Sequence, residues 1–223
     1  CTNFRWAIND LAVIGNHTFF YNSGNPDGPI VKVYRSFHDE CPEEHVAGFG
    51  SQTEAHKFLT SIEGSVGMST DQNRVYYMSP SSLDIHKINL KNYGQRTREY
   101  SDSDFYVPEI KSEADIWSGK VDFRAIMRET SIVEQIIVLD EHIIVMAEIG
   151  KEKYNEELGF YTAEDKKTKV IIFNKDLKYI DEFAYSHAHN GRLQTGNWFR
   201  YPSGIAYISR EPLGEEPVTS DRI

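Results

Sequence analysis

The sequence is poor in cysteine and lacks a long apolar run. Two cysteines, Cys1 and Cys41, occur among 223 residues. A small secreted fold that depends on disulfides carries more, so the core of this chain must come from side-chain packing. No run of about 18 or more apolar residues exists, and the sequence therefore predicts no membrane-spanning helix.

Several catalytic signatures are also missing. The sequence contains no Gly-x-Ser-x-Gly nucleophile motif, no glycine-rich phosphate-binding loop and no Cys-x-x-Cys pair. Carboxylates are plentiful, but no pair stands apart from the general acidity. None of these motifs therefore points to a particular class of enzyme.

Basic charge is in short supply as well. Asp and Glu total 34 against 24 Lys and Arg, and the formal net charge is −10. Binding to a nucleic-acid backbone needs clustered Lys and Arg, so the charge balance disfavours a nucleic-acid partner. The acidic residues are dispersed along the chain, which favours a role in solubility.

What the sequence does contain is a repeated pattern of short strands and polar turns. The clearest example of the unit lies between Gly64 and Leu90. It predicts a strand at 66–69, a tight turn at 71–73, a strand at 74–79 and a strand at 84–90, with an outer strand at 95–100. In the 84–90 strand the apolar alternation shifts by one residue after Ile85, so one face is only loosely specified.

Similar units are predicted before and after this segment. The predicted strands are 11–14, 17–21 and 30–36 in the first unit, 133–139, 142–149, 169–173 and 178–185 in the third, and 197–201 and 205–209 in the fourth. A charged loop is expected at 151–167. One helix is predicted at 51–62, with Ser51 as its N-cap and Glu54 three positions later. Residues 101–120 are expected to be irregular, and 120–130 fit either a short helix or a crossing segment.

The spacing of these units indicates the fold class. Their second strands centre near Phe19, Tyr76, Ile144 and Ala206, roughly 60 residues apart. A sandwich or a lipocalin-like barrel also produces many short strands. We favour an all-β β-propeller of four-stranded antiparallel blades, because the repeat unit is four strands long and its third strand often ends in a polar turn. Residues 1–223 then form one propeller domain with about four blades visible, an incomplete part of a six-bladed ring.

A family resemblance rests on four segments. These are MSTDQNRVYYMSPSSLDIHKINL, IIVLDEHIIVMAEIG, KVIIFNKDLKYIDEF and YPSGIAYISREP. In their order of strands and turns they resemble the six-bladed, TolB-like propeller lipoproteins of Bacteroidetes. The resemblance implies an exported protein of the periplasm or outer membrane, and it carries no active-site residue onto this chain. The chain is shorter than a full propeller of that family.

Cys1 has three interpretations. It is the arbitrary start of a trimmed chain, half of a disulfide with Cys41, or the lipid-bearing first residue of a mature lipoprotein. A lipidated cysteine is usually followed by a linker of small residues, whereas residues 4–8 here look structured. We therefore place the trimmed chain first.

Two clusters contain residues that bind metals elsewhere. His187 and His189 lie two apart at a strand end, where both side chains point to the same side and could share a divalent metal. The loop at 38–45 combines acids, histidines and Cys41, which fits a cation site or a cysteine nucleophile. In both cases a polar, solvated loop is the preferred interpretation, because no third ligand or ordered spacing is present. No cofactor is predicted.

These observations favour a non-catalytic binding propeller. Its loops between blades would recognise a protein or a small molecule around the central channel. One alternative is a metal-dependent hydrolase or lyase with a central site of His and acidic side chains. The other is a structural spacer that only separates further domains. The sequence does not indicate the ligand.

Overall fold

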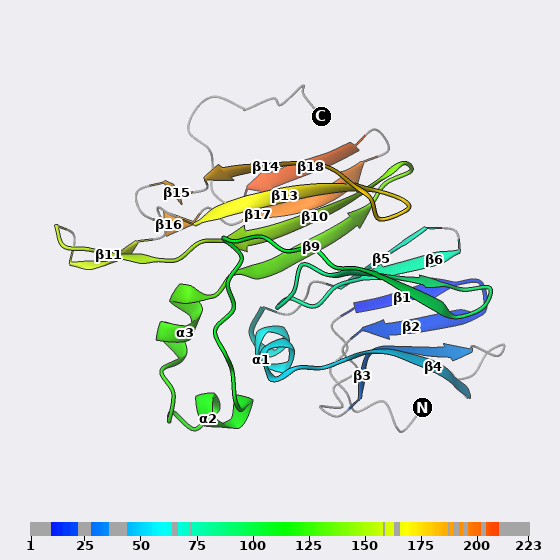
Figure 1. Cartoon of the computed structure of the whole chain (residues 1–223), viewed down its shortest axis with the longest axis horizontal. Helices are drawn as coiled ribbons and strands as arrows, with labels where there is room; N and C mark the ends of the chain where they lie inside the picture. Colours follow the sequence, from blue (N-terminus) through cyan, green and yellow to red (C-terminus); the bar gives the residue numbers. More distant parts are fainter. Residues whose placement is uncertain are drawn as a thin grey trace.

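Three four-stranded antiparallel sheets dominate the fold (Figure 1). The structure is a computed structural model, and it describes residues 10–21, 28–35, 44–63, 67–71, 73–157, 159–162, 166–186, 188–189, 192–193, 196–201 and 204–209. The strands of each sheet pair in chain order, with a separate hairpin inserted in the third sheet, so the predicted all-β class and the repeated four-stranded unit are confirmed at this level.

The first sheet has the strand order β1-β2-β3-β4. Its strands are β1 (Asp10–Ile14), β2 (His17–Tyr21), β3 (Pro29–Arg35) and β4 (Glu44–Ser51). The turn between β1 and β2 contains Gly15 with φ of 58°, a conformation that glycine adopts without strain. The three strands predicted here are confirmed, and β4 completes the sheet.

The second sheet has the order β5-β6-β7-β8. Its strands are β5 (Met68–Asp71), β6 (Arg74–Tyr77), β7 (Ile85–Asn89) and β8 (Gly94–Arg98). The shifted pattern in β7 has a structural reason, because Lys87 is buried there beside Ile88. The Lys87 ammonium donates a hydrogen bond to the backbone carbonyl of Lys175 at 2.9 Å, which gives this buried group a polar partner.

The third sheet has the order β14-β13-β10-β9. Its strands are β9 (Ile132–Val138), β10 (His142–Ile149), β13 (Lys167–Asn174) and β14 (Tyr179–Ser186). The loop predicted at 151–167 contains a hairpin, formed by β11 (Lys153–Asn155) and β12 (Phe160–Thr162), which projects beyond the sheet in Figure 1. The hairpin was not predicted because the segment is rich in charged residues. Its strands pair over three residues each, with Tyr154 opposite Tyr161.

Two short pairs of strands follow the third sheet. β15 (Ala188–His189) pairs with β16 (Arg192–Leu193), and β17 (Gly196–Tyr201) pairs with β18 (Gly204–Ser209). The hairpin of β17 and β18 confirms the two strands predicted for the fourth unit.

Three helices of the described residues lie in the connections between the sheets. They are α1 (Glu54–Glu63), α2 (Glu113–Trp117) and α3 (Phe123–Glu129). The predicted N-cap Ser51 was wrong, because Ser51 ends β4 and the Thr53 hydroxyl accepts the hydrogen bond from the backbone N–H of His56 at 3.1 Å. The segment left open between helix and crossing segment forms α3, and α2 lies where irregular chain was predicted.

Successive sheets pack against each other through apolar side chains. Phe19 and Val33 of the first sheet share a core with Val75 of the second. On the other side, Tyr76 of the second sheet packs in a cluster with Ile143 of the third. The first strands of the sheets are neighbours, since β1 contacts β5 and β5 contacts β9. The last strand of the second sheet, β8, is exposed along its whole length.

The connection after β8 is fixed to the third sheet by a polar cluster. Lys169 forms ion pairs with Asp102 and with Glu182, the latter at 2.7 Å. The Tyr100 hydroxyl also donates a hydrogen bond to Glu182. Hydrogen bonds from Lys169 and from the backbone of Asp104 hold the pKa of Asp102 below its usual value, although burial acts most strongly and in the opposite direction.

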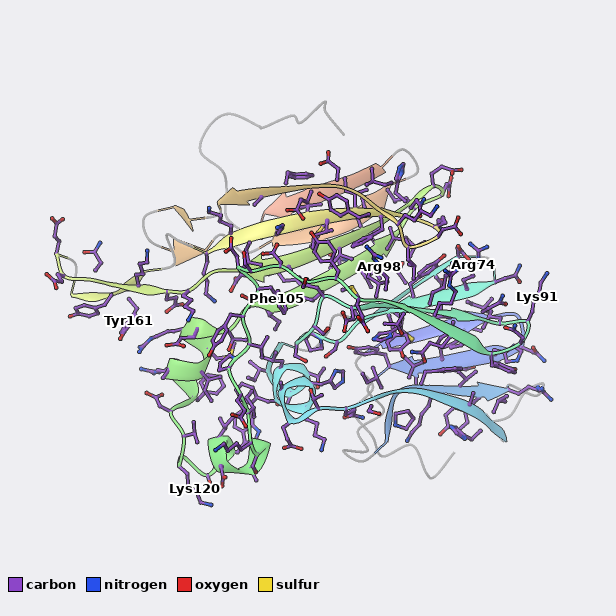
Figure 2. All side chains as sticks on the ribbon, viewed as in Figure 1. Arg74, Lys91, Arg98, Phe105, Lys120 and Tyr161 are labelled. Atoms are coloured by element: carbon purple, nitrogen blue, oxygen red, sulfur yellow. The ribbon has the colours of Figure 1, made fainter. Side chains whose placement is uncertain are left out.

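The sheets therefore have two unlike ends. The turns after the first and the third strand of each sheet lie at one end, which we call the hairpin end. The connections from one sheet to the next lie at the other end, where Phe58 of α1, Ile116 of α2 and Phe123 of α3 form a separate apolar cluster. Figure 2 shows Arg74 and Lys91 at the hairpin end and Lys120 far from them, beside the helices.

Candidate functional site

A depression of about 850 Å³ lies at the hairpin end. Turns and strand ends from all three four-stranded sheets contribute to its wall. The lining residues are Ile14, Thr70, Asp71, Asn73, Arg74, Asn89, Lys91, Leu139, Asp140 and Lys175. The volume is within the range of small-molecule sites, and the wall is mainly polar.

Chain connectivity explains why these residues meet. Asp71 ends β5 and Arg74 begins β6, so both stand at one tight turn. Lys175 lies in the turn between β13 and β14. Because each sheet is a meander, the turn after its first strand and the turn after its third strand lie at the same end. Packing of the sheets then brings the turns of different sheets together.

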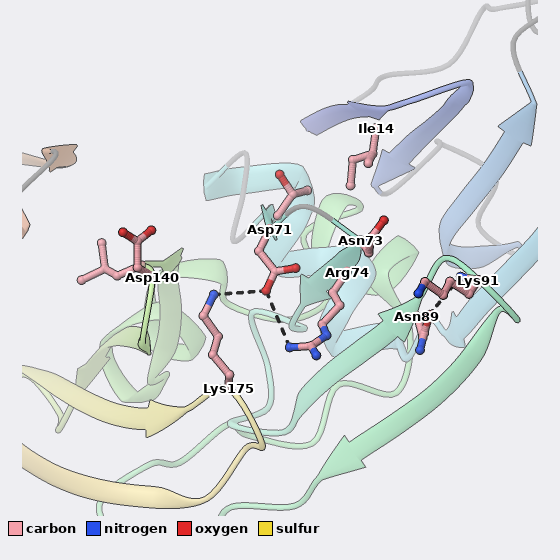
Figure 3. Close-up of a pocket in the computed structure, with 10 residues that line it drawn as sticks. Ile14, Asp71, Asn73, Arg74, Asn89, Lys91, Asp140 and Lys175 are labelled. Carbon is pink, nitrogen blue, oxygen red and sulfur yellow. Dashed lines mark hydrogen bonds and ion pairs between the residues drawn. The ribbon is translucent and has the colours of Figure 1, made fainter.

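Asp71 is the centre of an ion-pair group, which we call the Asp71 group (Figure 3). Its Oδ2 atom lies 3.2 Å from the Lys175 ammonium and 3.9 Å from a nitrogen of the Arg74 guanidinium. The Tyr76 hydroxyl donates a hydrogen bond to the same oxygen at 3.2 Å. Two hydrogen-bond donors and a more distant guanidinium, from two sheets, therefore surround one carboxylate oxygen.

Burial and hydrogen bonding shift the pKa values of Tyr76 and Arg74 in this group. The Tyr76 side chain is fully buried, and burial is the main cause that raises the pKa of Tyr76. The pKa of Arg74 is raised first by a hydrogen bond with Tyr76 and by the charge interaction with it. The phenol therefore stays a neutral donor and the guanidinium stays a cation over the physiological pH range.

Hydrogen bonds to the backbone stabilise the turn that carries Lys175. Asn174 accepts hydrogen bonds from the backbone N–H groups of Asp176 at 2.9 Å and Lys178 at 3.0 Å. The buried Lys87 ammonium donates to the carbonyl of Lys175 itself. Burial lowers the pKa of Lys87, and the nearby charge of Arg74 lowers it further. These contacts fix the position of the Lys175 backbone, and a fixed backbone orders the cation that it presents.

The side chains predicted as sites all lie outside the part of the chain whose side chains the structure describes. Cys1, Cys41 and His187 lie outside the described residues, and for His189 the strand is described but not its side chain. The metal, disulfide and lipidation hypotheses at these positions stay predictions. In the part of the chain that the structure describes, no group of three or more His, Cys, Asp or Glu side chains is placed to hold a metal ion.

Sequence reasoning identified the turns of the Asp71 group but not their role. Residues 71–73 were interpreted only as a tight turn, and residues 174–176 only as a polar turn that links two predicted strands. A usable signal was present, because charged residues recur at hairpin turns in successive units and such turns share one end of the sheets. The depression lies at the end opposite to the connections between sheets, to which ligand binding had been assigned.

Comparisons with known proteins show similarity of structure without a family match. No family model and no curated protein matches the sequence. A member of the DUF4221 family from Bacteroides vulgatus ATCC 8482 aligns with a TM-score of 0.52 and 12% identity, over 88% of this chain and 56% of that chain. A europium-containing methanol dehydrogenase aligns with a TM-score of 0.45 and 6% identity, over 79% of this chain and 24% of that chain.

The first alignment shows a shared fold, and the second is too weak to carry an argument. The chain spans about half the length of the DUF4221 protein and about a quarter of the dehydrogenase. The expected likeness to Bacteroidetes proteins is therefore found in coarse form, as a similar structure from a Bacteroides species. Among the described residues, no helix is long and apolar enough to cross a bilayer.

Proposed function

We propose that this chain is part of a β-propeller that binds a small polar molecule at its hairpin end. The observation that carries the proposal is the depression itself, which three successive sheets build together from polar and charged turn residues. A wall of this kind, supplied by rigid hairpins, positions ligand-binding groups without further ordering of the chain.

The contacts between first strands support the propeller. In a propeller the first strand of every blade lies next to the central channel and the last strand lies at the rim. Here β1, β5 and β9 follow one another as neighbours, and β8 is exposed as a rim strand would be. The hairpin of β17 and β18 would then begin a fourth blade. Six blades and the TolB-like type are part of this proposal.

The same arrangement gives the depression a place in the ring. Ile14 ends β1, Asp71 ends β5, and Leu139 directly follows β9. These residues mark the same end of the three innermost strands, and all three line the depression. The depression would therefore open at the mouth of the central channel, where propellers commonly receive ligands.

The chemistry of the wall favours binding over catalysis. The lining residues of the described chain include no histidine, cysteine or serine. Of the two carboxylates in the wall, Asp71 is already engaged by Lys175 and by the Tyr76 hydroxyl, and Asp140 also has an interaction partner. The wall therefore offers hydrogen-bond donors and acceptors in fixed positions rather than a group poised to transfer a proton near neutral pH.

A ligand screen on the natural protein and on a variant with a filled depression tests the binding function. The purified chain is titrated with a mixed set of neutral sugars, short peptides and small anions, and binding is followed by thermal melting. Asn73→Trp places a large ring in the depression and is expected to abolish the shift caused by any ligand found. Val121→Trp adds the same ring at an exposed position near the helices and should leave the shift intact. Ligand shifts that survive Asn73→Trp would refute binding at the depression.

Export to the cell envelope is a separate proposal, which rests on the resemblance to envelope lipoproteins. Fractionation of cells that produce the tagged natural protein tests it. Recovery in the periplasmic or outer-membrane fraction is expected, and recovery only with cytoplasmic markers would overturn the proposal.

A further inference from the structure

The Arg74 guanidinium has hydrogen-bond donors that the Asp71 group does not engage. The guanidinium of Arg74 approaches Asp71 only to 3.9 Å, which is beyond hydrogen-bond reach, whereas Lys175 approaches the same oxygen to 3.2 Å. Arginine binds a carboxylate most strongly through two parallel hydrogen bonds from its planar fork. Asp71 does not engage Arg74 in this way. The fork therefore keeps donors that the Tyr76 hydroxyl and Asp71 do not satisfy, and 42% of the Arg74 side chain is exposed.

The depression is cationic within an acidic protein. Its wall carries three cations, Arg74, Lys91 and Lys175, against two carboxylates, Asp71 and Asp140, which leaves one net positive charge among the lining residues. The carboxylate of Asp176 acts on Arg74 from outside the wall. The whole chain has a formal charge of −10. A concave surface with charge of one sign concentrates ligands of the opposite sign. The depression thus favours an anion although the protein as a whole repels one.

Asp71 behaves as an internal anion. Its Oδ2 atom accepts from Tyr76 and Lys175, and Figure 3 shows Lys175 and Arg74 on either side of the Asp71 carboxylate. Cations that are already ordered lose less conformational freedom when a ligand arrives. A ligand oxyanion that enters between them takes hydrogen bonds from the fork of Arg74 and shares Lys175 with Asp71.

We propose that the depression binds the oxyanion, carboxylate or phosphate, of a small polar molecule through Arg74 and Lys175, with Asp71 as the internal anion that orders them. The inference rests on the proposed binding function and names the ligand chemistry. Thr70, Asn73 and Asn89 provide hydroxyl and amide groups for the neutral remainder of the ligand.

Isothermal titration at low salt with three probes tests this inference. The probes are inorganic phosphate, glucuronate, and glucose as the neutral counterpart of glucuronate. Glucuronate or phosphate should bind more tightly than glucose, and the affinity should fall as sodium chloride is added. Tighter binding of phosphate or of glucuronate tells which oxyanion the natural ligand carries.

Variants of Arg74 and Asp71 are expected to change the affinity for the anion in opposite directions. Arg74→Gln is expected to weaken anion binding by about tenfold, because a charge-assisted hydrogen bond is lost. Arg74→Lys keeps the charge without the fork and should fall between that variant and the natural protein, which covers the case of a poorly folded Arg74→Gln. Arg98→Gln, a matched change of an exposed arginine that does not line the depression, should leave affinity unchanged. Asp71→Asn keeps a side-chain oxygen that can accept from Tyr76 and Lys175 but removes the competing negative charge, so it should strengthen anion binding.

The outcomes separate this inference from the proposed function. Weaker anion binding by Asp71→Asn would show that removing a negative charge beside the two cations does not favour an anion, and the inference would fail. If glucose binds as tightly as glucuronate and Asn73→Trp abolishes this binding, the inference that the ligand is an anion is overturned. The proposed binding function then remains in place. Absence of binding by all three probes up to about 1 mM would overturn the inference. The mixed screen would then decide on the binding function independently.

Discussion

His56 should make the stability of this protein depend on pH. It lies on α1 and is fully buried, with its Nδ1 atom 2.9 Å from the Ser79 hydroxyl and its ring 6.0 Å from that of Tyr21. Within the described chain its Nε2 atom has no hydrogen-bond partner. Burial lowers the pKa of His56 from 6.5 to about 4, so the ring is neutral in the folded protein at neutral pH.

The size of the effect follows from the two pKa values. In the unfolded chain the imidazole takes up a proton once the pH falls below 6.5, whereas in the folded protein it does so only near pH 4. The unfolded state therefore binds more protons between these values. The gap corresponds to a loss of about 3 kcal/mol in the free energy of unfolding. This contribution is fully present above pH 6.5 and is lost as the pH falls toward 4.

Urea unfolding at a series of pH values measures this loss. The natural protein and His56→Gln are compared between about pH 7 and pH 4, with circular dichroism as the signal. Carboxylates titrate in both proteins, so the difference between the two curves isolates His56. The natural protein is expected to lose about 3 kcal/mol more than the variant on acidification.

An exposed histidine supplies the control. His142→Gln changes an exposed residue at the start of β10 and should leave the pH dependence as it is in the natural protein. If the natural protein and His56→Gln lose stability in parallel as the pH falls, the argument that His56 is buried in its neutral form is refuted.

Three further changes test the fold by urea unfolding. Lys169→Gln should lower the free energy of unfolding by about 3 kcal/mol, because Asp102 is left buried without its cation. Lys120→Gln, which breaks an exposed pair with Asp115, should leave the midpoint unchanged, and equal midpoints for both variants would contradict the argument. Thr53→Ala should cost about 1 kcal/mol through loss of the α1 cap, whereas the same cost in Ser51→Ala would restore the cap predicted from sequence. Ile143→Ala should cost about 3 kcal/mol by opening a cavity between two sheets, and a cost no larger than that of Val13→Ala, which is 60% exposed, would refute the assigned core.

Local patterns were sufficient for most strands and turns. Alternation of apolar residues and the Gly15, Asp71 and Asn174 turns depend on neighbours a few positions away. The hairpins of β1 with β2, β5 with β6, and β9 with β10 were therefore predicted close to their observed bounds. Where local signals compete they failed, as at Ser51 and Thr53, since both residue types can cap a helix and only the end of β4 decides between them.

The tertiary structure decided what the turns do together. Asp71 and Lys175 are far apart in the chain, and no local pattern links a turn of one sheet with a turn of another. The buried Lys87 likewise breaks the strand pattern because its partner is the carbonyl of Lys175, which belongs to a different sheet. The sequence by itself determined the sheets as repeated meanders. The packing of those sheets determined that their hairpin ends enclose a depression, because the contacts that bring the ends together lie between residues that the sequence does not pair.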